Sequence, residues 1–188
     1  MKDKLPKTVI IAGPALTGKT TIAKQLETHF SYHFIEGDDL HPKANITKMS
    51  GGQPLNDSDR IPWLNIIGEE VASNVASHQN VVVTCSALRP EYRDVIRQHC
   101  DDILFVYLTA SFETLHQRAK LREHSATHFF NAAKNPQLLK DQIASSKPPY
   151  EEPDSLVIDL DSIQDHENKE SVFCSIVEHL GLSHAKCQ

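Results

Sequence analysis

Apolar positions gather in five short runs, each separated from the next by a segment with helical spacing. Several of these runs are almost continuously apolar and rich in β-branched residues, which is typical of parallel strands buried on both faces. The alternation predicts an α/β fold: a doubly wound, five-stranded parallel sheet with helices on both faces. The predicted strands are Thr8–Ala12, His33–Glu36, Val81–Ser86, Ile103–Leu108 and Leu156–Leu160.

Helical spacing is clearest after the first strand, where Ile22, Ala23 and Leu26 predict a helix from Thr20 to Phe30. Residues 124–136 show no clear period, and we interpret the stretch from about 123 to 137 as a mobile lid rather than a domain boundary. The whole chain, residues 1–188, is therefore expected to form a single domain.

The composition is that of an ordinary soluble protein, with 39% hydrophobic and 23% charged residues. No apolar run approaches the roughly 20 residues needed to span a bilayer, so no membrane partner is expected. No signal peptide is expected either, and four widely spaced cysteines without a C-x-x-C pair indicate reduced thiols in the cytoplasm. A net charge of −6 without a basic cluster argues against a nucleic-acid partner.

The stretch from Gly13 to Thr20 matches the spacing G-x-x-x-x-G-K-[ST]. It follows a predicted strand and precedes a predicted helix, as a phosphate-binding loop requires. In such a loop the backbone N–H groups and the positive end of the helix cradle nucleotide phosphates. The alternative, a chance glycine turn before a Lys-rich helix, is disfavoured by these flanking elements. The predicted nucleotide contacts are Gly13, Pro14, Ala15, Leu16, Thr17, Gly18, Lys19, Thr20 and Thr21.

Four residues of this loop have specific chemical roles. Gly13 and Gly18 let the backbone adopt positive φ and come close to phosphate oxygens. Lys19 places a compact ammonium against the β- and γ-phosphates, and the Thr20 hydroxyl is a hard oxygen ligand for Mg²⁺. The loop therefore predicts a site for a nucleotide and Mg²⁺.

Three carboxylates lie at the end of the second predicted strand, at the same edge of the sheet as the loop. Glu36 is expected to lie nearer the metal, and Asp38 nearer an acceptor hydroxyl, whose proton it can take. For Asp39 the alternative role, capping a helix that begins near His41, is equally credible. Their placement predicts phosphoryl-transfer chemistry.

The stretch from His41 to Leu64 is dense in polar residues, glycines and prolines, which suggests a pocket for a hydrophilic small molecule. Arg60 can hold a carboxylate through two parallel hydrogen bonds. The alternative is a solvated Arg60 on a long helix that runs to about Ser77 and is capped by Asp57-Ser58-Asp59. That cap does not exclude the carboxylate contact.

Two further segments carry candidate residues. Ser86 is small and leaves room for substrate, while Arg89 and Arg93 add positive charge one helical turn apart. Either arginine could serve an ordinary surface ion pair instead.

The predicted helix from Phe112 to Glu123 carries Arg118 and Arg122 on one face, just before the lid. Arginines delivered by a closing lid can stabilise a transferring phosphoryl group. The alternative is a solvated basic face paired with nearby glutamates. His124 and His128 could bind a metal if helical, but scattered surface histidines are the commoner case.

Four motifs resemble those of the small gluconate kinases of the P-loop kinase group. They are Gly37-Asp38-Asp39-Leu40-His41-Pro42, Asn45-Ile46-x-Lys48-Met49, Gly52-x-Pro54-Leu55-Asn56-Asp57-x-Asp59-Arg60-x-Pro62-Trp63-Leu64 and Cys85-Ser86-Ala87-Leu88-x-x-x-Tyr92-Arg93-Asp94. With the phosphate loop they cover the first half of the chain densely. The resemblance is therefore far more specific than the loop, which alone indicates only a nucleotide.

The resemblance implies a P-loop kinase fold with a mobile lid, ATP-dependent phosphorylation of D-gluconate at its 6-hydroxyl, and often a homodimer. It implies that Asp38 orients or deprotonates the acceptor, that Arg60 clamps the carboxylate, and that Arg118 and Arg122 act from the lid. The candidate catalytic residues are Lys19, Asp38, Arg118 and Arg122; the candidate substrate contacts are Asp38, His41, Arg60, Ser86, Arg93 and His128; the candidate metal ligands are Thr20 and Glu36.

The chain departs from the family pattern in two places. The family loop usually reads G-V-S-G-S-G-K-S, so Ala15 and Leu16 replace a small hydroxyl residue and a glycine. The family also has His-Phe about seven residues after the first lid arginine, whereas His128-Phe129 follows Arg118 by ten, and residues 131–137 are lengthened. The pattern resumes at Leu138-Leu139-x-x-Gln142.

Three other functions remain open on the sequence. A related kinase acting on shikimate or a nucleoside monophosphate is disfavoured by the polar stretch from His41 to Leu64. A GTP-dependent switch is disfavoured because neither N-K-x-D nor D-x-x-G occurs. The altered loop and lid are compatible with a sensor that kept the fold and lost turnover.

Overall fold

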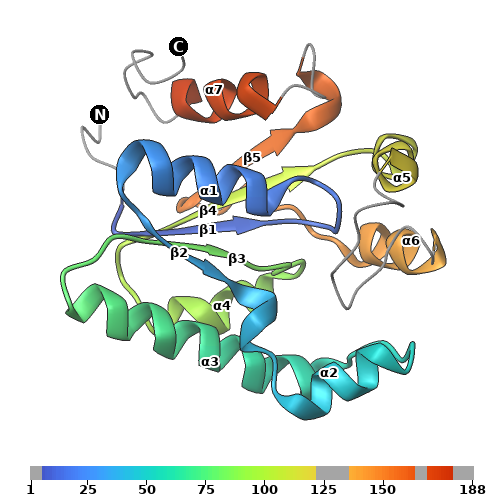
Figure 1. The fold of residues 1–188 in the computed structure, drawn as a ribbon, viewed down its shortest axis with the longest axis horizontal. Helices are drawn as coiled ribbons and strands as arrows, with labels where there is room; N and C mark the ends of the chain where they lie inside the picture. Colours follow the sequence, from blue (N-terminus) through green and yellow to red (C-terminus); the bar gives the residue numbers. More distant parts are fainter. Residues whose placement is uncertain (1–5, 122–135, 164–168, 180–188) are drawn as a thin grey trace.

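The computed structural model describes residues 6–121, 136–163 and 169–179. Within these residues five parallel strands form one sheet in the order β2-β3-β1-β4-β5, which confirms the predicted architecture (Figure 1). The strands are β1 (Thr8–Ala12), β2 (His33–Glu36), β3 (Val81–Thr84), β4 (Ile103–Thr109) and β5 (Ser155–Asp159).

Strand β3 ends at Thr84, two residues before the predicted end. Cys85 and Ser86 lie beyond the strand but still form backbone hydrogen bonds with β1 and the residue that follows it. Cys85 N–H donates to Ile11 O at 3.1 Å, and Ser86 O accepts from Gly13 N–H at 3.1 Å. The loop after β3 is therefore attached directly to the phosphate-binding loop.

Helices cover both faces of the sheet. In Figure 1, α1 and α7 lie on one face and α3 and α4 on the other, while α2, α5 and α6 lie towards the carboxyl ends of the strands. The helices are α1 (Lys19–Phe30), α2 (Lys43–Ser50), α3 (Asp57–Ala76), α4 (Pro90–Arg97), α5 (Phe112–Leu121), α6 (Pro136–Ser145) and α7 (Lys169–His179); the 3₁₀ turns are η1 (Gly37–Leu40) and η2 (Leu160–Ser162).

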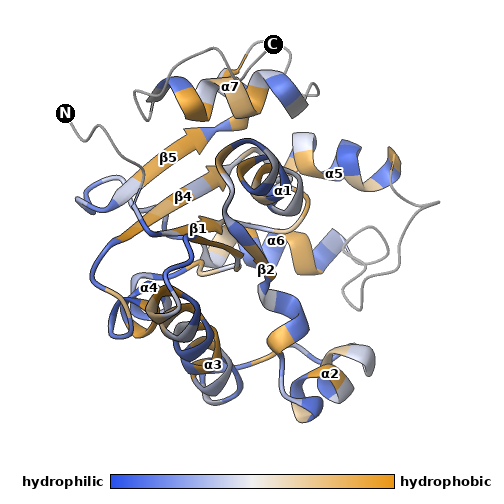
Figure 2. Ribbon diagram, turned by 60° about the vertical axis from the view of Figure 1, so that its left-hand side comes forward, coloured by the Kyte–Doolittle hydropathy of each residue, from blue (hydrophilic) through white to orange (hydrophobic). Residues whose placement is uncertain are grey.

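The continuous hydrophobicity of β1 follows from its position between β3 and β4. Val9 and Ile11 pack into the core under α1 and α7, whereas Ile10 and Ala12 pack into the core over α3 and α4. All four are fully buried, so the strand has no polar face. The central strands are accordingly hydrophobic along their length in Figure 2.

Helix α3 begins with a capping box, but one residue earlier than expected. Asn56 is the N-cap: its side chain accepts a hydrogen bond from Asp59 N–H, and the Asp59 carboxylate accepts one from Asn56 N–H. The prediction that Asp57 to Asp59 cap this helix was therefore wrong in detail, because the reciprocal pair needs its two members three residues apart.

The predicted lid largely falls outside the described residues, since 123–135 are among those that the structure does not describe. Its last two residues, Pro136 and Gln137, belong to the first turn of α6. The lid therefore stays a prediction.

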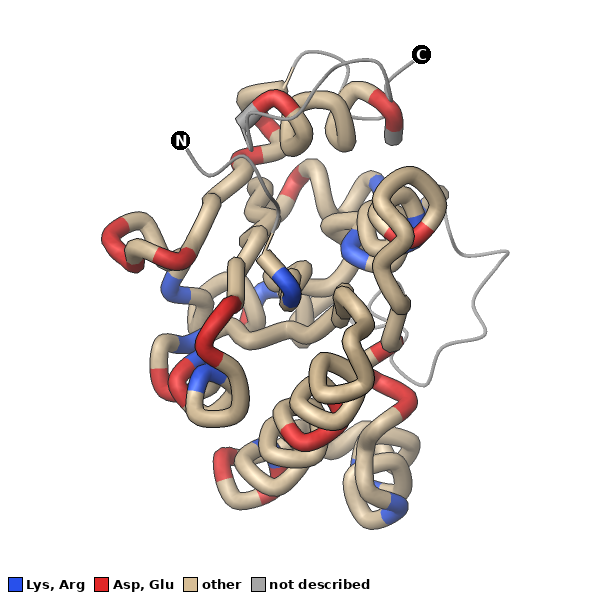
Figure 3. The backbone as a smooth tube through the Cα atoms, turned by 90° about the vertical axis from the view of Figure 1, so that its left-hand side faces the viewer, with Lys and Arg blue, Asp and Glu red and all other residues tan. Residues whose placement is uncertain are grey.

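Charged residues of both signs are interspersed along the described chain (Figure 3). None of the described helices combines the length and the apolar character needed to cross a membrane.

Candidate active site

The loop between β1 and α1 has the backbone geometry of an anion cradle. Gly13 and Gly18 have φ values of +127° and +95°, which confirms the positive φ predicted for them. A Cβ on Gly13 would lie 2.1 Å from the carbonyl oxygen of Leu108, so no other residue fits between the loop and β4. Leu16, where the family pattern has glycine, also has a positive φ, +70°.

Side chains from three elements contact this loop. Lys19 Nζ donates to Pro14 O at 2.9 Å, and Arg118 Nη1 on α5 donates to the carbonyls of Leu16 and Thr17 at 3.4 and 3.3 Å. From α6, Gln142 Oε1 accepts a hydrogen bond of 2.9 Å from Ala15 N–H. A phosphate in the cradle would compete with Gln142 for this amide.

The residues predicted to hold the metal lie together beside the loop. Glu36, at the end of β2, accepts hydrogen bonds from the hydroxyls of Thr20, at 2.8 Å, and Thr84. No cluster of three or more His, Cys, Asp or Glu side chains suited to a metal occurs among the described residues. One hydroxyl and one carboxylate fit Mg²⁺, which keeps several waters and takes oxygens from the substrate phosphates.

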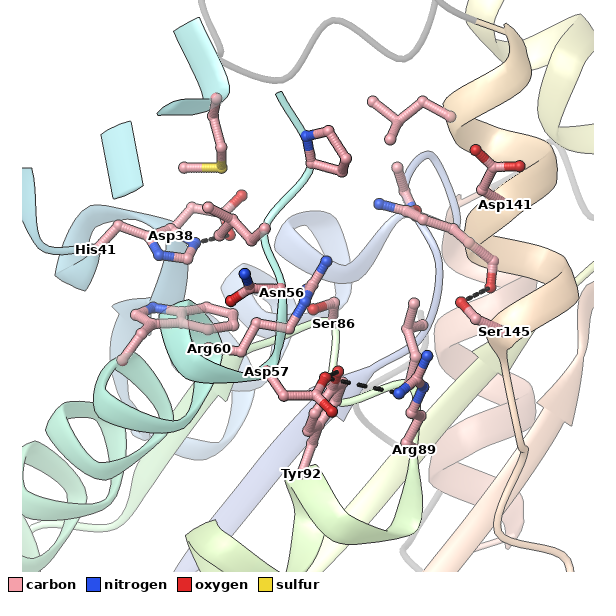
Figure 4. A pocket seen from close by; sticks show the side chains of 18 of the residues that line it. Asp38, His41, Asn56, Asp57, Arg60, Ser86, Arg89, Tyr92, Asp141 and Ser145 are labelled. Atoms are coloured by element: carbon pink, nitrogen blue, oxygen red, sulfur yellow. Dashed lines mark hydrogen bonds and ion pairs between the residues drawn. The ribbon is translucent and has the colours of Figure 1, made fainter. Parts of the chain in front are cut away.

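The turn that carries Asp38 is pinned from two sides. Trp63 Nε1 donates to Gly37 O at 2.8 Å, and Gly37 N–H donates to Thr84 Oγ1 at 3.3 Å. A Cβ on Gly37 would lie 2.1 Å from Thr84 O, so the turn is pressed against β3. The Asp38 carboxylate is 59% exposed and lines the cavity described below (Figure 4).

Asp39 also lines this cavity. The alternative role proposed for it, capping the next helix, is not observed. The N-cap of α2 is Pro42, and no side chain makes a cap hydrogen bond there.

His41 is a neutral imidazole beside Asp38. Its ring stacks on Trp63 with centroids 4.0 Å apart, and burial, followed by the charge of Arg60, lowers its pKa to about 4. Asn45 Nδ2 lies 3.3 Å from His41 Nδ1, which makes Nδ1 the acceptor and assigns the proton to Nε2. Nε2 lies 4.0 Å from Asp38 Oδ1.

A cavity of about 890 Å³ opens between these elements at the carboxyl ends of the strands. We call its two sides the phosphate wall, formed by residues 13–20, and the acceptor wall, formed by η1 and the first turns of α3 and α4. Lys19 and Ala15 line it from the first side, and Asp38, His41 and Arg60 from the second. Ser86 and the α6 residues Leu138, Asp141, Gln142 and Ser145 also line it.

The far end of the acceptor wall is built around Tyr92. The guanidinium carbons of Arg60 and Arg89 lie 5.8 and 5.6 Å from the centre of its ring. The Tyr92 hydroxyl donates to Asp57 Oδ1 at 2.6 Å. Burial, together with this hydrogen bond, raises the pKa of Tyr92.

Arg93 does not face the cavity, so its prediction as a substrate contact was wrong. Its side chain is completely buried, and its guanidinium donates to Ala87 O at 2.9 Å, Lys147 O at 3.1 Å and both oxygens of Glu152. These hydrogen bonds hold the pKa of Glu152 below its ordinary value. The side chain points inward because Arg93 is one position past the residue of α4 that faces the cavity, Tyr92.

The site residues that were predicted from the sequence and that line the cavity are Ala15, Lys19, Asp38, His41, Arg60 and Ser86. Asp57, Tyr92, Asp141 and Gln142 were not selected, although Asp57, Tyr92 and Gln142 stand inside the quoted sequence patterns. Arg122 and His128 lie outside the described residues.

The match to known proteins agrees with this geometry. Residues 16–181 match the family model described as Shikimate kinase. A probable gluconokinase from Schizosaccharomyces pombe is 41% identical over 168 residues, which are 86% of this chain and 83% of that protein. The chain belongs to the gluconokinase family.

Solved structures separate the gluconokinase family from the wider fold. The crystal structure of a gluconokinase from Sinorhizobium meliloti is 34% identical, covers 95% of this chain and 97% of its own, and superposes with a TM-score of 0.74. A shikimate kinase from Bacteroides thetaiotaomicron is 14% identical, covers 93% and 98%, and has a TM-score of 0.56. The latter shares the fold alone.

Proposed function

We propose that this member of the gluconokinase family transfers the γ-phosphoryl group of ATP to the 6-hydroxyl of D-gluconate, giving 6-phospho-D-gluconate and ADP. One observation carries the proposal: the phosphate loop with Lys19, the carboxylate of Asp38 and the guanidinium of Arg60 line one cavity. A triphosphate, an alcohol and a carboxylate each have a matching group there. The family membership supports the same substrates.

The proposed reaction needs positioning and charge neutralisation more than covalent help. Loop amides and Lys19 bind the triphosphate. Asp38 accepts the proton of the 6-hydroxyl as its oxygen bonds to the γ-phosphorus, and the bond from that phosphorus to the bridging oxygen breaks. ADP leaves with the electron pair.

His41 supports Asp38 in this scheme. Its imidazole is neutral, so it places no positive charge beside the carboxylate, and its Nε2–H faces Asp38. Asn45 holds the ring in that tautomer. His41 can therefore orient the Asp38 carboxylate through a neutral N–H group.

Mg²⁺ bound with ATP neutralises part of the phosphate charge, and Thr20 and Glu36 are the residues that would hold it. Arg118 already lies against the loop, through Leu16 and Thr17. The roles of Arg122 and His128 stay predictions.

A coupled assay of ADP release tests the function directly. At saturating ATP, gluconate should have the highest kcat/KM in a panel with shikimate, a nucleoside monophosphate and D-glucitol, and ³¹P NMR should identify a 6-phosphate monoester. Equal turnover of the panel, or a preference for shikimate, would reject the substrate. ATP binding without turnover of any acceptor would favour the sensor alternative.

Four further expectations also stay predictions. Removal of Mg²⁺ with EDTA should abolish turnover, and added Mg²⁺ should restore it. Sedimentation at micromolar concentration should give the mass of a homodimer, and fractionated cells should contain the protein in the cytoplasm. A single cooperative unfolding transition is expected if residues 1–188 form one domain.

A further inference from the structure

At the far end of the acceptor wall, the nearby carboxylates do not neutralise all of the positive charge of the arginines. No carboxylate within residues 6–121, 136–163 and 169–179 lies within ion-pair distance of Arg60. Its closest aromatic partner is Tyr92. Arg60 therefore faces the cavity as a cation with no bound counter-ion among the described residues.

The second guanidinium at this end, that of Arg89, has only a weak anionic partner. Arg89 Nη1 lies 3.6 Å from Asp57 Oδ1, the same oxygen that accepts the hydrogen bond from the Tyr92 hydroxyl. The side chains of Arg89 and Asp57 are 41% and 62% exposed. A long, one-oxygen contact between exposed groups is readily displaced.

From this geometry we propose that Arg89, together with Arg60, binds the carboxylate of the acceptor, and that Tyr92 positions both guanidinium groups. The inference rests on the proposed function and deepens it: it assigns the groups that select a sugar acid over a neutral polyol. Asp57 is then the internal carboxylate that the substrate displaces from Arg89.

The arrangement in Figure 4 supports this assignment. In that view Arg60 reaches into the cavity between Asp38 and Arg89, so a linear acid with its alcohol at Asp38 directs its carboxylate towards the arginines. The substrate carboxylate can offer both of its oxygens to the planar guanidinium donors. Asp57 contacts Arg89 through one oxygen only, and that oxygen also accepts the hydrogen bond from Tyr92.

Contacts with Tyr92 explain why both arginines stay in place without a substrate carboxylate. Guanidinium groups are attracted to the face of an aromatic ring, and the hydrogen bond to Asp57 fixes the ring. A neutral polyol leaves Arg60 without a counter-ion in the complex and leaves Arg89 with only its long contact to Asp57. Sites built for a charged partner reject analogues that lack it.

Arg89→Gln tests the binding role. The KM for gluconate should rise about 10-fold to 100-fold, while the KM for ATP and the inhibition constant of D-glucitol change less than about threefold. Lys24→Gln, which removes the same charge from the exposed surface of α1, should leave all three unchanged. Equal losses for gluconate and glucitol, or no loss, would overturn the assignment.

Asp57 and Tyr92 give effects of distinct sign and size. Asp57→Asn should lower the KM for gluconate, because it removes the competing charge and keeps an oxygen for Tyr92. Tyr92→Phe should keep most of the affinity for gluconate, whereas Tyr92→Leu should lose about as much as Arg89→Gln. A KM that rises in Asp57→Asn, or equal losses in the two Tyr92 variants, would contradict these roles.

Measurements on the wild-type protein separate this inference from the proposed function. If the wild type does not phosphorylate gluconate, the proposed function is rejected, and with it the carboxylate as ligand. If the wild type phosphorylates gluconate and Arg89→Gln has the same KM for gluconate, only the inference is rejected.

Discussion

Apart from Lys19 and Thr20, the phosphate wall presents main-chain groups, whereas the acceptor wall presents charged and aromatic side chains. On the first, Ala15 and Leu16 differ from the family pattern, yet Gly13 and Gly18 still have positive φ. On the second, Asp38 and Arg60 line the cavity, and the proposed function depends on their side-chain groups. A wall of amides tolerates side-chain replacement, and a wall of side chains does not.

The largest effect is expected on the acceptor wall, at Asp38. Asp38→Asn should lower kcat about 10²-fold to 10⁴-fold, because the amide cannot take the hydroxyl proton. The KM for ATP should change less than about threefold. Asp39→Asn is the matched control in the same turn, with a loss expected below about tenfold. Steady-state kinetics that gave the same loss of kcat in Asp38→Asn and Asp39→Asn would contradict the role of Asp38.

Arg93 supports the acceptor wall from beneath. Arg93→Gln should lower the free energy of unfolding by about 3 kcal/mol, because the variant leaves Glu152 with fewer partners and strips two carbonyls of their donor. The KM for gluconate should rise more than that for ATP, since Ala87 adjoins Ser86.

Urea denaturation measures the Arg93 effect. Asp94→Asn, which removes only an exposed partner of Arg97, should cost less than about 1 kcal/mol. Similar losses in the two variants would show that the buried network does not hold this wall.

His41 should make stability depend on pH. Its pKa is lowered to about 4 in the folded protein, against 6.5 in the unfolded chain. The unfolded state therefore binds more protons between these values, and stability falls as pH decreases from 6.5 to 4. The loss is up to about 3 kcal/mol. His41→Gln should flatten this part of the profile in urea titrations, and an unchanged slope would exclude His41 as its source.

The smallest effect is expected on the phosphate wall, at Leu16. Leu16→Gly relieves about 1–2 kcal/mol of left-handed strain, but it loses apolar packing and adds freedom to the unfolded chain. These terms nearly cancel, so stability should change by less than about 1 kcal/mol. The KM for ATP should stay within about threefold. A larger change in either would show that this wall depends on side-chain identity after all.

The phosphate loop could be recognised from sequence because its residues are contiguous and its function resides in backbone geometry. The strands could also be predicted from contiguous residues, since a strand buried on both faces must be apolar throughout. Arg93 was misassigned because the sequence places it next to a cavity residue, and only the packing of α4 shows that it turns inward. Gln142 reaches Ala15 across 127 positions, a distance that no local pattern encodes.

The sequence by itself was enough to predict the parallel sheet, the loop between β1 and α1, and Asp38 and Arg60 as residues of the cavity, because these predictions depend on spacing and residue type along the chain. Only the tertiary structure decided which charged groups share a cavity and which are already neutralised. Arg60, Arg89 and Arg93 have the same chemistry. The folded chain pairs Arg93 with a carboxylate beneath the wall and directs Arg60 into the cavity.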